Sequence, residues 1–129
     1  MDKLREKLNN ILLQHLDVEK SNLEKIYSNE EKFTKSLEKK LNENSDEILE
    51  DCNKMDVLTT ERMHSEQQFL SGIIKTVETF VHGITSVQQK GLSDGTMAVQ
   101  GLQSLVELSE KGDEKRANSV EQFVINQLN

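Results

Sequence analysis

The 129-residue sequence contains no proline and no tryptophan, and it has only one tyrosine and four phenylalanines. Average usage of proline is about 5%, which would place roughly six in a chain of this length. Proline interrupts helix interiors, so its absence, together with abundant Leu, Glu, Lys and Gln, predicts long helices. Hydrophobic residues make up only 34% of the chain, which argues against a deep core formed by a single chain.

Other absences limit the partners that the chain can be expected to have. The formal net charge is −7, so non-specific attraction to nucleic acid or to anionic lipid is not expected. The first ten residues, MDKLREKLNN, are charged and lack the apolar core of a signal peptide. No run of eighteen apolar residues occurs. We therefore expect no nucleic-acid partner, no membrane partner and a cytoplasmic location.

The residues that carry enzyme chemistry are also scarce. The single cysteine, Cys52, excludes an intrachain disulfide and lies among acidic residues that disfavour a reactive thiolate. No phosphate-binding loop, dinucleotide fingerprint or serine-nucleophile motif is found. The segment ERMH, residues 61–64, matches the Glu-x-x-His ligand pair of ferritin-like bundles, but these need a second such pair, which is missing. His15 is interpreted as a boundary residue and His82 as exposed. We predict no enzyme activity, no cofactor and no metal.

The N-terminal part of the chain shows the apolar spacing of a helix. Its leucines step by four at first, and the later apolar residues step by three and four: Leu4, Leu8, Leu12, Leu16, Leu23, Ile26, Phe33 and Leu37. The polar segment NENSDE, residues 42–47, could form a turn or continue the helix. Because it holds neither proline nor glycine, the sequence favours continuation.

The strongest periodic signal lies in residues 69–87, FLSGIIKTVETFVHGITSV. With Leu70 at heptad position a, the a and d positions are filled six times in succession, by Leu70, Ile73, Val77, Phe80, Ile84 and Val87. Ile74 and Val81 at position e widen the apolar face beyond what a two-stranded seam requires. β-Branched residues at the core positions favour three or four strands. We expect this face to be a seam where more than two helices meet.

Three glycines then cluster in KGLSDGTMAVQG, residues 90–101. Glycine followed by Ser or Asp is typical of the end of one helix and the N-cap of the next, here Ser93 or Asp94. The sequence therefore predicts one elongated rod segment over residues 1–129. It would consist of a helix over about 1–90, a break near 91–95 and a helix over about 96–128.

A charged, imperfect heptad helix, SNLEKIYSNEEKFTKSLEKKL, followed by the charge-poor SEQQFLSGIIKTVETFVHGI, resembles the central stalk of the kinesin-5 class of bipolar mitotic kinesins. The resemblance extends over roughly residues 20–110. It implies a fragment of a motor protein in which four chains assemble into an antiparallel helical bundle, with motor pairs at both ends that slide microtubules. It also implies a place at the cytoskeleton or the mitotic spindle.

The sequence as a whole predicts an all-α fold of long helices in an oligomeric coiled coil or antiparallel bundle, four-stranded, whose partner is a copy of the same chain. Its function would be structural: an oligomerisation module, a homotetramer, that sets the geometry of attached domains. The expected interface is formed by Leu23, Ile26, Phe33, Leu37, Leu70, Ile73, Ile74, Val77, Phe80, Val81, Ile84 and Val87. The alternative is a monomeric, spectrin-like three-helix bundle that turns near 42–46 and 91–95 and acts as a spacer or adaptor.

Overall fold

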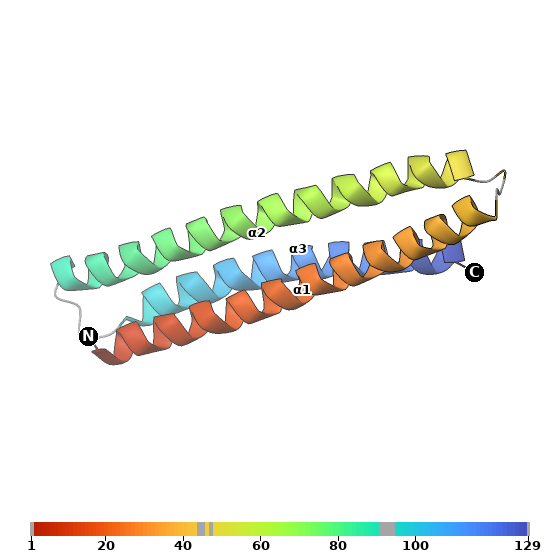
Figure 1. The fold of residues 1–129 in the computed structure, drawn as a ribbon. Helices are drawn as coiled ribbons and strands as arrows, with labels where there is room; N and C mark the ends of the chain where they lie inside the picture. Colours follow the sequence, from red (N-terminus) through yellow and green to blue (C-terminus); the bar gives the residue numbers. More distant parts are fainter. Residues whose placement is uncertain (1, 44–45, 47, 91–94, 129) are drawn as a thin grey trace. The chain divides into compact units, whose positions relative to one another are not determined.

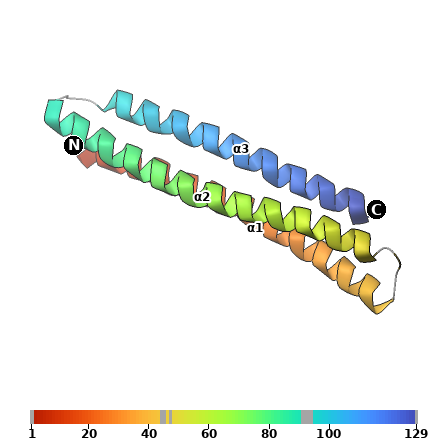
Figure 2. The same cartoon turned by 90° about the horizontal axis from the view of Figure 1, so that it is seen from above.

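The computed structural model describes residues 2–43, 46, 48–90 and 95–128. These residues form three α-helices and no strand: α1 (Asp2–Asn42), α2 (Ile48–Lys90) and α3 (Thr96–Leu128). Figure 1 shows the helices in sequence colours, and Figure 2 shows them from above. The predicted all-α class is confirmed.

The first helix ends earlier in the chain than the sequence analysis favoured. Instead of one helix over about residues 1–90, α1 ends at Asn42 and α2 begins at Ile48, and Glu43 and Asp46 lie in turns. Helices gain most of their stability from packing an apolar face, and the segment NENSDE has no apolar side chain to pack. A reversal here lets the apolar residues of α1 and α2 cover each other. Residues 44, 45 and 47 lie outside the described residues.

The second connection falls where three glycines cluster in the sequence. Helix α2 ends at Lys90 and α3 begins at Thr96. The predicted N-caps Ser93 and Asp94 lie outside the described residues. Gly95 is described, and its carbonyl accepts a hydrogen bond from the Val99 backbone N–H at 2.9 Å. A Cβ atom at Gly95 would overlap the Leu4 side chain, so a larger residue here would require Leu4 to shift.

The chain divides into two compact units, and each helix contributes to both. Unit 1 consists of residues 1–20 and 68–112, and unit 2 of residues 21–67 and 113–129. Contacts within each unit fix the directions of the helices. In unit 2, Lys40 meets Asp51 and Glu30 meets Arg62, so α1 and α2 are antiparallel. In unit 1, α1 and α3 run in the same direction, because Leu4 lies against Gly95 and His15 against Glu110.

Each unit has its own apolar core. Three helical segments each contribute two buried residues to the core of unit 1, which consists of Leu4, Leu8, Ile84, Val87, Leu102 and Val106. The core of unit 2 consists of Ile26, Phe33, Leu58, Ala117, Val120 and Val124. The rings of Phe33 and Phe123 lie 6.5 Å apart in a tilted arrangement there. Because the cores form inside one chain, much of the apolar surface read from the sequence is covered without a partner.

Helices α2 and α3 approach each other closely at Gly83 in unit 1. A Cβ atom built at Gly83 would lie 3.1 Å from the Ala98 Cβ atom of α3. That separation is tighter than ordinary van der Waals contact between carbons. The two small residues therefore permit a short distance between the helices, which explains a glycine inside an otherwise regular helix.

Candidate interaction surface

Four apolar side chains of α2 remain exposed on one face of unit 1. Leu70, Ile74, Val77 and Val81 are 60%, 58%, 40% and 54% exposed. Their spacing of four, three and four residues places them on one side of a helix with 3.6 residues per turn. We call these four residues the α2 stripe. Single exposed apolar residues are common, whereas a continuous row of four is a candidate interaction surface.

The segment of α2 that carries the α2 stripe has few charges of its own. Lys75 and Glu78 are the only formal charges in residues 69–87, and they have opposite signs. Both residues are exposed, as are Ser71 and Thr85. No basic residues cluster along this segment of α2.

The structure divides the predicted interface residues into three groups. Ile26, Phe33, Ile84 and Val87 are buried in the intrachain cores. Leu23, Leu37, Ile73 and Phe80 are half-buried. Only the α2 stripe stays exposed. The six a and d residues of segment 69–87 thus have different environments. Packing within unit 1 covers the C-terminal end of this segment and leaves Leu70 and Val77 exposed.

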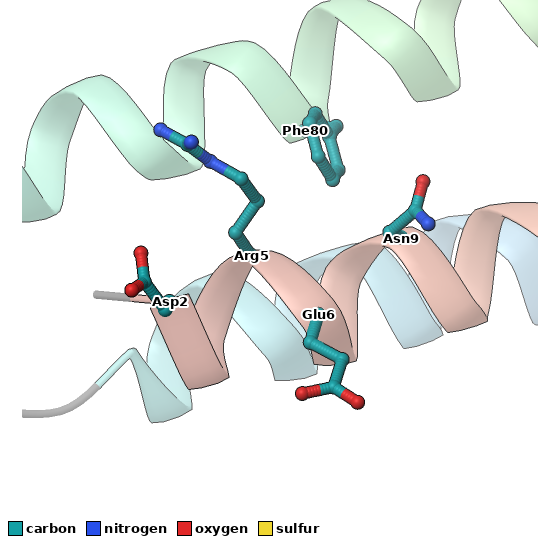
Figure 3. Close-up of a pocket in the computed structure, with 5 residues that line it drawn as sticks. All are labelled: Asp2, Arg5, Glu6, Asn9 and Phe80. Atoms are coloured by element: carbon teal, nitrogen blue, oxygen red, sulfur yellow. The ribbon is translucent and has the colours of Figure 1, made fainter.

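Phe80 borders a shallow pocket between α2 and the first turns of α1, lined also by Asp2, Arg5, Glu6 and Asn9. In Figure 3 the Phe80 ring points from α2 toward α1, Arg5 and Asn9 point toward α2, and Glu6 points away. The four α1 residues are exposed. The lining is therefore one aromatic ring and four polar or charged side chains.

The buried polar residues of unit 1 were not found by sequence reasoning. His15, expected at the boundary of the apolar stripe, has a side chain only 1% exposed, with Nδ1 3.2 Å from Glu110 Oε1 and 3.9 Å from Glu19 Oε1. Ser109 Oγ lies 3.4 Å from Glu19 Oε1. The signal that could have located these residues is their seam spacing: His15 and Glu19 follow Leu4, Leu8 and Ile11 at steps of three and four.

Ionic contacts in unit 2 join its helices at their polar edges. Between α2 and α1, Arg62 Nε lies 2.8 Å from Glu30 Oε2. Within α2, Arg62 Nη1 lies 3.0 Å from Glu66 Oε1. The hydrogen bond to Glu66 is the main reason that the pKa of Arg62 is raised. Burial, and then the charge of Glu66, raise the pKa of Tyr27 above its ordinary value.

The residues weighed for chemistry do not gather into a site. Cys52, His64 and His82 are exposed. Glu61 of the ERMH segment pairs with Arg116, with 3.5 Å between Glu61 Oε2 and Arg116 Nε. Among the described residues, no three His, Cys, Asp or Glu side chains are arranged to hold a metal ion. Within those same residues, no helix is long and apolar enough to cross a membrane.

Comparisons with known proteins found no relative of the chain. No protein-family model, curated protein or solved structure matches the chain.

Proposed function

We propose that the chain is a structural helical module that associates with a copy of itself through the α2 stripe. The observation that carries the proposal is the exposure of Leu70, Ile74, Val77 and Val81 in a continuous row. A closed two-fold contact uses the same patch on both chains, so an apolar stripe can serve as its own partner. The opposite charges of Lys75 and Glu78 leave residues 69–87 without net formal charge, which favours like-to-like contact.

The expected burial energies indicate that self-association through the α2 stripe depends on concentration. Full burial of an aliphatic side chain contributes roughly 1.5–3 kcal/mol, so each half-exposed stripe residue would add about 1 kcal/mol. Two stripes together would give about 8 kcal/mol, against an estimated 4–15 kcal/mol for the lost freedom of two chains. The stripe alone therefore supports weak pairing. A stable four-chain assembly, as the kinesin-5 resemblance implies, would need further surface, and that biological setting remains a prediction.

A monomeric spacer or adaptor is the second candidate. It is favoured by the two intrachain cores, which bury Ile26, Phe33, Ile84 and Val87 without a partner. The positions of the helix ends also match the turns expected for a three-helix bundle, near 42–46 and 91–95. In this case the α2 stripe would contact a different protein or remain in water.

Sedimentation over a wide concentration range separates the two candidates. Wild type should show a mass above one chain that rises with concentration. The double variant Ile74→Glu/Val81→Glu should keep the helical content and sediment as one chain. Leu108→Glu is the matched control, because Leu108 is 74% exposed on α3 of the same unit and its substitution should leave the association intact.

Two results would refute self-association through the stripe: a one-chain mass for wild type at every concentration, or an unchanged mass for the double variant. Phe80→Asp is less informative than these exposed changes, because Phe80 also packs against the core of its own unit. Its substitution would reduce folding and assembly together.

A further inference from the structure

Helix α1 also carries an exposed leucine in unit 1. Leu13 is 52% exposed, and its neighbours Leu12 and Leu16 are half-buried. Leu13 does not belong to the core of unit 1. Its position relative to α2 follows from the side chains around Phe80.

Leu13 projects beside α2. Arg5 and Asn9 point toward α2, and Glu6 points away from it (Figure 3). At about 100° per residue, Leu13 falls about 40° beyond Asn9 and about 20° short of Glu6. It therefore lies on the flank of α1 that adjoins α2, outside the contact between the two helices, which agrees with its exposure. Val18, nine residues after Asn9, lies on the opposite side of α1.

The α2 stripe lies on the matching flank of α2. The Phe80 ring points toward α1 (Figure 3), and the stripe residues follow about 60–120° around the helix, in the same sense as Leu13 follows Asn9. Both flanks open to the same side of the helix pair, because rotations of one sense about two antiparallel axes point to the same side.

The contacts of α3 show that α1 and α2 are antiparallel in unit 1. Gly83 of α2 faces Ala98 of α3. Gly72 faces Ser109, so α2 runs opposite to α3. Since α3 runs in the direction of α1, α2 runs opposite to α1 as well.

Leu13 is level with the middle of the α2 stripe. Phe80 and Asn9 line the same pocket, and Leu13 lies four residues, or about 6 Å, further along α1 than Asn9. In an antiparallel pair the same step leads from Phe80 back to the level of Val77 and Ile74. Leu13 and the α2 stripe therefore form one exposed apolar surface, which we call the α1–α2 face.

We infer that a second copy of the chain places its α2 stripe on the α1–α2 face, so that α1 takes part in the association through Leu13. This rests on the proposed self-association through the stripe. Unit 1 holds seven Lys or Arg and eight Asp or Glu residues, against nine and fifteen in unit 2. A second copy of this acidic chain therefore meets little repulsion at unit 1, and a partner selected by its charge would find little attraction there.

Leu13 adds contact that the stripe alone lacks. A helix laid on the α1–α2 face touches two helices, as neighbouring helices in bundles do. In a two-fold pair each copy buries its own Leu13. Two half-exposed leucines would strengthen the association roughly thirtyfold, which moves it from the weak pairing of the stripe toward a stable dimer.

Sedimentation of two matched variants tests the part of α1. Leu13 and Val18 are both exposed apolar residues of α1, 52% and 39% exposed, on different sides of the helix. Leu13→Gln should raise the Kd of the dimer about tenfold to thirtyfold. Val18→Gln should leave the Kd within about threefold of wild type. Circular dichroism checks that both variants keep their helical content.

Disulfide cross-linking detects the contact directly. In a Cys52→Ser background, chains with Leu13→Cys are mixed with tagged chains that carry Leu70→Cys, Ile74→Cys, Val77→Cys or Val81→Cys. A mixed disulfide, recognised by its mass, should form with at least one of the four, because a disulfide requires Cα atoms within about 7 Å. Val18→Cys should form none. If Leu13→Gln loses helical content, the cross-linking result decides alone.

The outcomes separate this inference from the proposed function. A one-chain mass for wild type at every concentration would refute both. If wild type associates and Ile74→Glu/Val81→Glu does not, self-association through the stripe stands. In that case, an unchanged Kd for Leu13→Gln would overturn the part of α1. So would the absence of every mixed disulfide with Leu13→Cys, or an equal loss of association in Val18→Gln.

Discussion

Lys40 of α1 donates a hydrogen bond to Asp51 of α2, with 2.6 Å between Lys40 Nζ and Asp51 Oδ2. The two residues lie on either side of the chain reversal in unit 2. The Asp51 side chain is 7% exposed and that of Lys40 is 27% exposed. A charged hydrogen bond that is shielded from water in this way connects the end of α1 to the start of α2.

Removal of this contact should weaken unit 2. Asp51→Ala is expected to lower the free energy of unfolding by about 1–3 kcal/mol, the usual range for hydrogen bonds to charged groups. Urea denaturation followed by circular dichroism measures the change. Glu31→Ala is the matched control: its pair with Lys35 is 67–72% exposed and is worth under about 0.5 kcal/mol. If both substitutions lowered the free energy of unfolding equally, the Lys40–Asp51 contact would contribute no more than an exposed ion pair.

Leucines on α3 should differ sharply in their importance for folding. Leu102 is 0% exposed in the core of unit 1, whereas Leu108 is 74% exposed on the same helix. Leu102→Ala should cost about 2–5 kcal/mol through lost burial and the cavity left behind. Leu108→Ala should change stability by less than about 0.5 kcal/mol. Thermal or chemical denaturation compares them, and a large loss for Leu108→Ala at low concentration would contradict the placement of α3.

Glycines inside the helices should also respond differently to alanine. At Gly101 a Cβ atom meets no other atom within 4 Å, so Gly101→Ala should stabilise the chain by about 0.5–1 kcal/mol. At Gly83 the new Cβ would lie 3.1 Å from that of Ala98. Because of this contact, the stabilisation that alanine brings through its higher helix propensity should be reduced or reversed at Gly83. If Gly83→Ala stabilised the chain as much as Gly101→Ala, the close approach of α2 and α3 would be refuted.

Tyr27 should titrate above pH 10.0, the ordinary value for a tyrosine. Burial comes first among the causes that raise its pKa, followed by the charge and hydrogen bond of Glu66. Because the folded state holds the proton more tightly, this contribution to stability is present below the unfolded pKa of 10.0. It is lost as the pH rises through the folded pKa.

Ultraviolet absorbance of tyrosinate measures this titration directly, since Tyr27 is the only tyrosine. Glu66→Gln should lower the midpoint toward 10.0 without reaching it, because partial burial remains. Glu24→Gln serves as the control, as Glu24 is not among the groups that shift the pKa of Tyr27. A wild-type midpoint at or below the ordinary value would contradict the described surroundings of Tyr27.

The local properties of the helices could be predicted from the sequence. The absence of proline, the strong helix formers and the steps of three and four act within a few turns, so they predicted an all-α chain. Periodicity also identified apolar residues that became core, including Leu4, Ile26, Phe33 and Ile84. It could not locate the end of α1, because NENSDE has acceptable helix propensity and only its lack of packing partners favours a turn.

Tertiary contacts decided which of these residues are buried and which stay exposed. The apolar face of residues 69–87 looks continuous in the sequence, yet Ile84 and Val87 are covered by α1 and α3 while the α2 stripe is left exposed. His15 looked like a boundary residue, yet its side chain is buried in contact with Glu110, which is 95 positions away. Helix formation depends on neighbours along the chain, whereas burial depends on which distant segments pack together, and periodicity carries no information about that choice.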